Sequence, residues 1–134
     1  MKAAAVMLPV LNRSIRVVIV DDEPLFVEMV QALLEVEEGI EVVGKGRNGK
    51  EGVKLAIELE PDVVVMDISM PVMNGLDATR ELRESNPTAC VLILTGGTNI
   101  AEIDRARKAG AAAYLTKDRI AGDLVAEIRN VAGR

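Results

Sequence analysis

The sequence contains one cysteine and very few aromatic residues. Because Cys90 has no second cysteine to pair with, an internal disulfide is excluded, and a buried, inert thiol in a reducing, cytoplasmic setting is favoured. Aromatic residues make up 1% of the chain and hydrophobic residues 49%, so the core must consist of Val, Ile, Leu, Ala and Met. The length, 134 residues, is that of one compact domain.

Long hydrophobic runs and an excess of basic charge are also lacking. The longest apolar stretch near the N-terminus, Ala3 to Leu11, is interrupted by Pro9 and is too short for a signal peptide or a membrane span, so no membrane partner is expected. We expect residues 1–14 to form a flexible N-terminal extension and residues 15–134 to form the domain. The net charge of −5 argues against a nucleic-acid surface in this chain and fits a cation-binding site rich in carboxylates.

Strand-like and helix-like patterns alternate five times along the chain. Apolar runs predict strands at 15–20, 40–43, 63–66, 91–94 and 112–115. Helices are predicted from Pro24 to about Gly39, after Gly49, at 76–85, at 100–109 and from Ile120 to about Ile128. The expected inner faces of the first two helices carry Phe26, Met29, Val30, Leu33 and Val36, and then Val53, Ala56 and Ile57. Strands that alternate with helices in this way predict an α/β fold with a mostly parallel sheet.

Polar residues stand at the ends of four predicted strands. Asp21 and Asp22 follow the first strand, Asp67 the third, Thr95 the fourth and Lys117 the fifth. A doubly wound sheet has either the Rossmann order or the flavodoxin-like order 2-1-3-4-5, and the latter brings the three aspartates together at its switch point. We therefore expect a (βα)5 flavodoxin-like three-layer sandwich with the order 2-1-3-4-5.

The expected cluster permits a narrow range of chemistry. Three neighbouring carboxylates repel one another unless a cation binds, and oxygen ligands completed by waters suit Mg²⁺. Lys117 could neutralise a phosphoryl oxygen and Thr95 could offer a hydroxyl to another. Asp67 could then attack phosphorus and form an acyl phosphate.

Four motifs in combination resemble those of a response-regulator receiver (CheY-like) domain: V-D-D-E-P, M-D-I-S-M-P-V-M-N-G, L-T-G-G and Y-L-T-K-D. The phrases P-D-V-V-V-M-D-I-S-M-P and A-G-A-A-A-Y-L-T-K-D are similar to those of the NarL/FixJ-type subfamily. The resemblance covers about Ile15 to Val131. It implies a two-component signalling domain rather than an enzyme, with the following residues in the site: Asp67, Thr95 and Lys117 as catalytic residues, Asp21, Asp22, Asp67 and the Ser69 carbonyl as Mg²⁺ ligands, and Thr95 and Tyr114 as the switch.

The resemblance also implies the partners. A sensor histidine kinase would transfer a phosphoryl group to Asp67, and the face made by residues 100–109, 112–115 and 120–128 would change in response. A homodimer is a further partner that the family suggests. DNA would be contacted only through an effector domain absent from this chain, which would make the chain the regulatory part of a transcriptional regulator. The alternative is a stand-alone receiver that acts by protein contacts.

Some features depart from the family pattern. Gly96 and Gly97 follow Thr95 where Ala or Ser is common, which makes this loop more flexible and bears on the lifetime of the acyl phosphate. The helix at 100–109 is unusually basic through Arg105, Arg107 and Lys108, which fits either a solvated face or a partner surface.

Two other classes of protein share parts of the pattern. A small Mg²⁺-dependent aspartyl phosphohydrolase of the haloacid-dehalogenase type would need a second acid two residues after the nucleophile, where Ser69 stands. A flavodoxin-like cofactor binder would need a loop rich in glycine and hydroxyl groups after the first strand, where Asp21, Asp22 and Glu23 stand.

Overall fold

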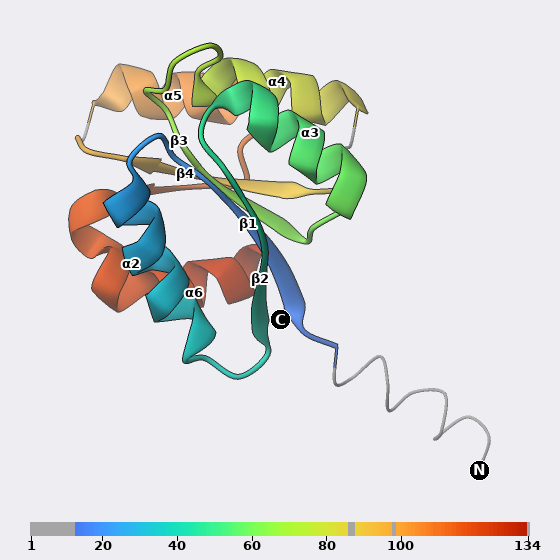
Figure 1. Ribbon diagram of the computed structural model, residues 1–134. Coiled ribbons are helices and arrows are strands. Elements are labelled where there is room, and N and C mark those ends of the chain that lie inside the picture. Colours follow the sequence, from blue (N-terminus) through green and yellow to red (C-terminus); the bar gives the residue numbers. More distant parts are fainter. Residues whose placement is uncertain (1–12, 86–87, 98, 134) are drawn as a thin grey trace.

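In the computed structural model, which describes residues 13–85, 88–97 and 99–133, five strands alternate with helices (Figure 1). The predicted extension, residues 1–14, lies outside these residues except for its last two, and it stays a prediction. The elements are β1 (Ile15–Val20), α2 (Pro24–Glu35), β2 (Ile40–Gly46), α3 (Gly49–Leu59), β3 (Val63–Asp67), α4 (Gly75–Ser85), β4 (Cys90–Thr95), α5 (Ile100–Ala109), β5 (Ala113–Thr116), the 3-10 turn η1 (Lys117–Arg119) and α6 (Ile120–Val131).

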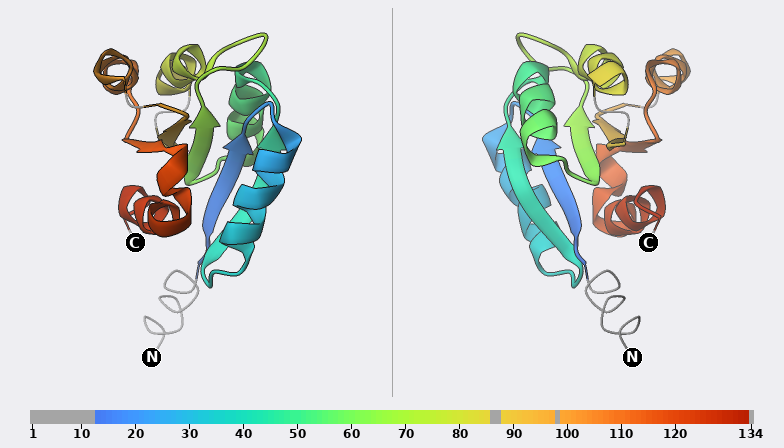
Figure 2. Two further views of the ribbon diagram at one scale, coloured as in Figure 1. Left: turned by 90° about the vertical axis from the view of Figure 1, so that its left-hand side faces the viewer. Right: turned by 90° about the vertical axis from the view of Figure 1, so that its right-hand side faces the viewer.

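The strands form one parallel sheet in the order β2-β1-β3-β4-β5, which confirms the predicted order. Helices α2 and α6 cover one face of the sheet, and α3, α4 and α5 cover the other (Figure 2). Because all strands run in the same direction, their carboxyl ends lie along one edge. The three-layer flavodoxin-like sandwich is therefore the fold of the chain.

Alternate residues of β1 show how the sheet separates two cores. Val17 and Ile19 pack with α2 and α6, whereas Val18 and Val20 pack with α3 and α4. All four side chains are at most 1% exposed. A fully buried Val or Ile stabilises the fold by roughly 1.5–3 kcal/mol, so these two aliphatic layers provide the main stabilisation. The aromatic residues Phe26 and Tyr114 are only partly buried against them.

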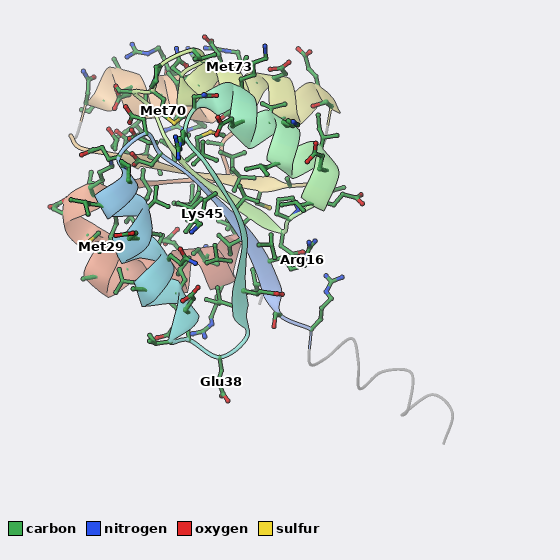
Figure 3. All side chains as sticks on the ribbon, viewed as in Figure 1. Arg16, Met29, Glu38, Lys45, Met70 and Met73 are labelled. Carbon is green, nitrogen blue, oxygen red and sulfur yellow. The ribbon has the colours of Figure 1, made fainter. Side chains whose placement is uncertain are left out.

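The predicted inner faces of α2 and α3 are correct only in part. Val30, Val53 and Ala56 are buried as expected, but Met29, Val36 and Ile57 are 45%, 79% and 52% exposed. Met29 projects from the outer side of α2 (Figure 3), and α2 instead buries Val27, Val30 and Leu34, with Phe26 and Leu33 half-buried beside them. The helix ends at Glu35, so Val36 is its C-cap and lies beyond the last packed turn.

Strand β2 extends beyond the predicted 40–43 to Gly46, and two glycines belong to the added part. A Cβ at Gly44 would meet the side chain of Leu59, and one at Gly46 would press on the start of α3. The glycines therefore let α3 pack closely on this edge strand. The prediction of a buried thiol also needs correction, because Cys90 is half-buried and its Sγ lies 3.3 Å from the carbonyl oxygen of Val131.

Arg16, near the amino end of the sheet, is hydrogen-bonded to the end of α3. Its Nη1 donates to the carbonyl oxygens of Leu59 and Glu60 at 2.6 and 3.0 Å. Its backbone N–H donates to Oδ2 of Asp62 at 2.8 Å. A cation at a helix C-terminus satisfies carbonyls that have no intrahelical partner, so Arg16 caps α3 across the chain.

Candidate functional site

The carboxyl ends of four neighbouring strands bring the predicted site residues to one edge of the sheet. Asp21 follows β1, Asp67 ends β3, Thr95 ends β4 and Lys117 follows β5. Carboxylate oxygens of Asp21, Asp22 and Asp67 all lie within 4.8 Å of one another. The predicted clustering of the three acids is therefore present in the structure.

Asp21 and Asp22 differ in their surroundings although they are adjacent. The backbone N–H of Asp21 donates to the carbonyl of Gly46, which continues the pairing of β1 with β2. Asp21 is 2% exposed, and its Oδ1 accepts from the N–H of Glu23 at 2.9 Å. Asp22 is exposed. The chain thus holds one carboxylate rigidly inside the site and presents the other from the solvent side.

Lys117 is the cation that joins the acids. Its Nζ lies 3.0 Å from Oδ2 of Asp21 and 3.4 Å from Oδ1 of Asp67. It also lies 3.7 Å from Oε1 of Glu23 and 4.1 Å from the centroid of the Phe26 ring. An aromatic face at this distance attracts an ammonium group, so Phe26, which the sequence pattern assigned only to the core, also helps to place Lys117.

The carboxyl group of Asp67 has a raised pKa. Burial and the nearby charge of Asp21 raise the pKa of Asp67 to about 6, against the opposing effect of Lys117. For Lys117, burial lowers the pKa, but the hydrogen bond to Asp21 and the charges of Asp67 and Asp21 outweigh it, so the pKa lies above its usual value. The raised pKa means that burial, and then the charge of Asp21, destabilise the ionised Asp67, which a bound cation would stabilise.

The donor set fits Mg²⁺. It consists of hard carboxylate oxygens with an open side at Asp22, where waters can complete an octahedral shell. Ser69, whose carbonyl is the fourth predicted ligand, is exposed and lies two residues after Asp67 in the segment between β3 and α4. Its role as a ligand stays a prediction.

The segment from Ile68 to Asn74 is tied down at both ends. The N–H of Gly75 donates to the carbonyl of Ile68 at 2.8 Å, and the N–H of Gly49 donates to that of Met73 at 2.8 Å. Gly75 also approaches the backbone of Asp67 so closely that a Cβ would overlap its carbonyl oxygen. The missing side chain of Gly75 therefore lets α4 begin directly against the end of β3.

Thr95 and Tyr114 share a partner that the sequence analysis missed. The Oγ1 of Thr95 lies 2.9 Å from Oε1 of Glu102, and the Tyr114 hydroxyl lies 3.0 Å from the same oxygen. The Tyr114 hydroxyl also lies 3.1 Å from the carbonyl oxygen of Gly97. Burial and the Glu102 carboxylate raise the pKa of Tyr114. Glu102 stands three residues after Asn99, which is a capping-box spacing, but that signal predicts only a helix start.

The basic residues of α5 mostly form local ion pairs. Arg107 and Lys108 lie 3.7 and 3.0 Å from carboxylate oxygens of Asp104, one turn away, and their side chains are 74% and 77% exposed. Arg105 is exposed as well. Of the two interpretations of this helix, the contacts favour a solvated face.

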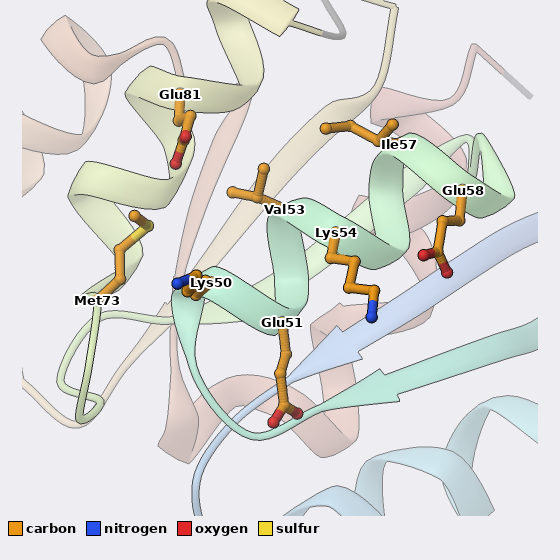
Figure 4. Close-up of a pocket in the computed structure, with 8 residues that line it drawn as sticks. All are labelled: Lys50, Glu51, Val53, Lys54, Ile57, Glu58, Met73 and Glu81. Carbon is orange, nitrogen blue, oxygen red and sulfur yellow. The ribbon is translucent and has the colours of Figure 1, made fainter.

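Two surface hollows lie near the carboxyl edge. The larger, of about 590 Å³, lies between α3 and α4 and has an apolar floor of Val53, Ile57 and Met73 (Figure 4). The smaller, of about 280 Å³, is bordered by Asp21 and Asp22. The charged site therefore opens into the smaller hollow. In the described part of the chain, none of the helices is both long enough and apolar enough to span a membrane.

Comparisons with known proteins agree with this geometry. Residues 17–129 match the family described as response regulator receiver domain. The chain is 40% identical over 117 residues to the transcriptional regulatory protein LnrK of Bacillus subtilis, and the match covers 87% of this chain and 53% of that protein. It is 33% identical over 116 residues to the nitrate/nitrite response regulator protein NarL of Escherichia coli, and the match covers 87% of this chain and 54% of that protein. The chain thus spans about half the length of these relatives.

Solved structures give the same result. The signal receiver domain of the putative response regulator NarL from Mycobacterium tuberculosis has a TM-score of 0.87 at 30% identity, covering 90% of this chain and 98% of that one. The response regulator domain of Thermotoga maritima CheB has a TM-score of 0.86 at 31% identity, covering 91% and 98%. The predicted resemblance to receiver domains, including the NarL-type subfamily, is confirmed.

Proposed function

Because the chain belongs to the response regulator receiver family, we propose that Asp67 accepts a phosphoryl group from the phosphohistidine of a sensor histidine kinase. The observation that carries the proposal is the position of Asp67. It is a buried carboxylate at the end of a central strand, within 4.8 Å of two further acids and 3.4 Å from a lysine ammonium. A carboxylate in such a setting is a nucleophile flanked by groups that can bind a cation and an anion.

Each neighbouring group has a part in the transfer. Asp21, Asp22, Asp67 and the Ser69 carbonyl would hold Mg²⁺, which supplies charge neutralisation for the incoming phosphoryl oxygens. Asp67 must be ionised to attack phosphorus, and its pKa of about 6 leaves most of it ionised at neutral pH. Lys117, fixed by Asp21, offers a positive charge to a phosphoryl oxygen.

The response would involve Thr95 and Tyr114. Thr95 is one position beyond Leu94, the register partner of Asp67 on the neighbouring strand, so its hydroxyl is close to where a phosphoryl group would form. Donation from Thr95 to that group would change the environment of Tyr114 on β5. The face formed by α5, β5 and α6 would then shift between two arrangements.

The names of the relatives suggest the output. LnrK and DegU are transcriptional regulatory proteins, and about half of each lies outside the matched region. We infer that this chain is the cytoplasmic regulatory part of a transcriptional response regulator, with DNA contacted through an effector domain and with a second copy of the chain as a further partner. A stand-alone receiver that acts through protein contacts is the alternative for this output.

The test is the intact mass of the protein after incubation with acetyl phosphate. We expect one phosphoryl adduct that forms only with Mg²⁺ and does not form when EDTA is present. The adduct should be absent from Asp67→Ala, because no other acid among the described residues occupies the end of β3. Asp77→Asn removes an exposed acid of α4 that pairs with Arg80, and it should leave the adduct unchanged.

Two results would contradict the proposal. An adduct of full size in Asp67→Ala would place the acceptor elsewhere in the chain. Continuous release of phosphate with rapid turnover would instead indicate a phosphohydrolase.

A further inference from the structure

One carboxylate oxygen is shared by the two side chains of the proposed switch. Oε1 of Glu102 lies 2.9 Å from Oγ1 of Thr95 and 3.0 Å from the Tyr114 hydroxyl. A carboxylate can only accept, so at this oxygen both hydroxyls are donors. Glu102 is half-buried, in the first turn of α5.

A hydroxyl has a single proton, which makes these contacts exclusive. While Thr95 donates to Glu102, it cannot donate to a phosphoryl oxygen on Asp67. Tyr114 has an alternative acceptor in the carbonyl of Gly97 at 3.1 Å, but Thr95 must exchange Glu102 for the phosphoryl group.

The start of α3 shows that the position of Glu102 is not simply a feature of its local motif. Both helices have an asparagine N-cap with a glutamate three residues later. In α3, Oε1 of Glu51 turns back and accepts from the backbone N–H of Arg47, the residue before the N-cap, at 2.9 Å. In α5, Oε1 of Glu102 instead accepts from side chains of β4 and β5, which ties the helix to both strands.

We propose that Glu102 is a positioning residue that holds the Thr95 and Tyr114 hydroxyls in the unphosphorylated protein and competes with the phosphoryl group for the Thr95 proton. The proposal rests on the function proposed above, in which Thr95 donates to a phosphoryl group on Asp67. The Thr95–Glu102 hydrogen bond then characterises the resting state of the switch, and it must break before Thr95 can donate to a bound ligand. Removing that acceptor favours the bound arrangement even before ligand is added.

The test is the affinity for beryllium trifluoride, which mimics a phosphoryl group, in the presence of Mg²⁺. Hydrogen bonds to charged acceptors are among the stronger ones, so Glu102→Ala should bind the probe about tenfold more tightly than the wild type. Glu102→Gln keeps a neutral acceptor and should show a smaller gain. Asp104→Asn removes a carboxylate from the same helix that pairs only locally with Arg107 and Lys108, and it should behave as the wild type.

A second readout comes from Tyr114, which is the single tyrosine of a chain without tryptophan. Its emission reports directly on the contact between phenol and carboxylate. In the absence of ligand, Glu102→Ala should already show a Tyr114 emission shifted towards that of the ligand-bound wild type. General destabilisation would not reproduce this shift together with tighter binding.

A third variant tests whether Glu102 acts through Thr95. In a Thr95→Val background, Glu102→Ala should give no gain in affinity, because there is no hydroxyl proton left to compete for. A gain that persists in this background, or an unchanged or weaker affinity of Glu102→Ala alone, would overturn the proposal while the function of Asp67 stands. A wild type that does not bind the probe at all would overturn both proposals.

Discussion

Replacement of Asp67 by asparagine should raise the free energy of unfolding of the Mg²⁺-free protein at pH 7 by about 2 kcal/mol. A shift of about two pKa units corresponds to about 3 kcal/mol, and solvent screening of this partly buried group reduces the effect. The cause is the burial of the carboxylate beside Asp21, which raises its pKa to about 6 from the ordinary 3.8. Ionised Asp67 therefore destabilises the folded state, and Lys117 offsets this only in part. Asparagine keeps the shape of the side chain and removes the charge.

The same shift fixes the direction of the pH dependence. The folded state binds its Asp67 proton more tightly than the unfolded state, so this contribution to stability is fully present below about pH 4. It is lost as the pH rises through about 6, and Asp67→Asn should lack this loss. Urea unfolding in EDTA across this range measures the difference, with Asp77→Asn as a surface control. If the free energy of unfolding changed with pH in the same way for wild type and Asp67→Asn, ionised Asp67 would not destabilise the folded state.

Replacement of Gly75 by alanine should lower the free energy of unfolding by about 3 kcal/mol and also reduce phosphorylation, because overpacking against a rigid backbone is costly. A Cβ at Gly75 would overlap the carbonyl oxygen of Asp67 and press on Ile68. These are backbone atoms at the end of β3 and one residue beyond it, so the clash can be relieved only if α4 moves away from the end of β3. That movement would displace the Asp67 carboxylate.

Urea unfolding and the phosphoryl adduct together test this expectation. Gly122→Ala is the matched control, because Gly122 lies inside α6 with open space where its Cβ would be. There alanine should stabilise the helix by about 0.5–1 kcal/mol and leave the adduct intact. If Gly75→Ala were as stable as Gly122→Ala, the close approach of α4 to Asp67 would be wrong.

The sequence predicted the fold and the acid cluster because both depend on topology. Once parallel strands take the order 2-1-3-4-5, residues at their carboxyl ends must meet, so Asp21 and Asp67 could be placed together without coordinates. Which residues of a helix face the core is harder to predict than the order of the strands. Met29 has the right spacing for an inner face, but α2 buries Val27, Val30 and Leu34 and leaves Met29 45% exposed.

The contacts that Glu102 and Phe26 make with site residues were not predictable from the sequence. Glu102 and Phe26 each have a simple local explanation, as a helix-start acid and a core residue. Their contacts with Thr95 and Lys117 depend on how α5 and α2 cross the strand ends and on the rotamers chosen there. Contacts of this kind leave no repeating pattern in the sequence from which they could be predicted.

The bonds made by Arg16 give the two edges of the sheet different local rigidity. At the amino edge, Arg16 joins β1 to the end of α3 through carbonyl oxygens and to Asp62. At the carboxyl edge, the carboxylates of Asp21, Glu23 and Asp67 share the single ammonium group of Lys117. Local opening is easiest where stabilising contacts are fewest, so we expect the amide protons beyond β3 to exchange with solvent faster than those beside Arg16. A ligand that neutralises the acids would then slow exchange at one edge alone, so the domain would change in stiffness as well as in shape.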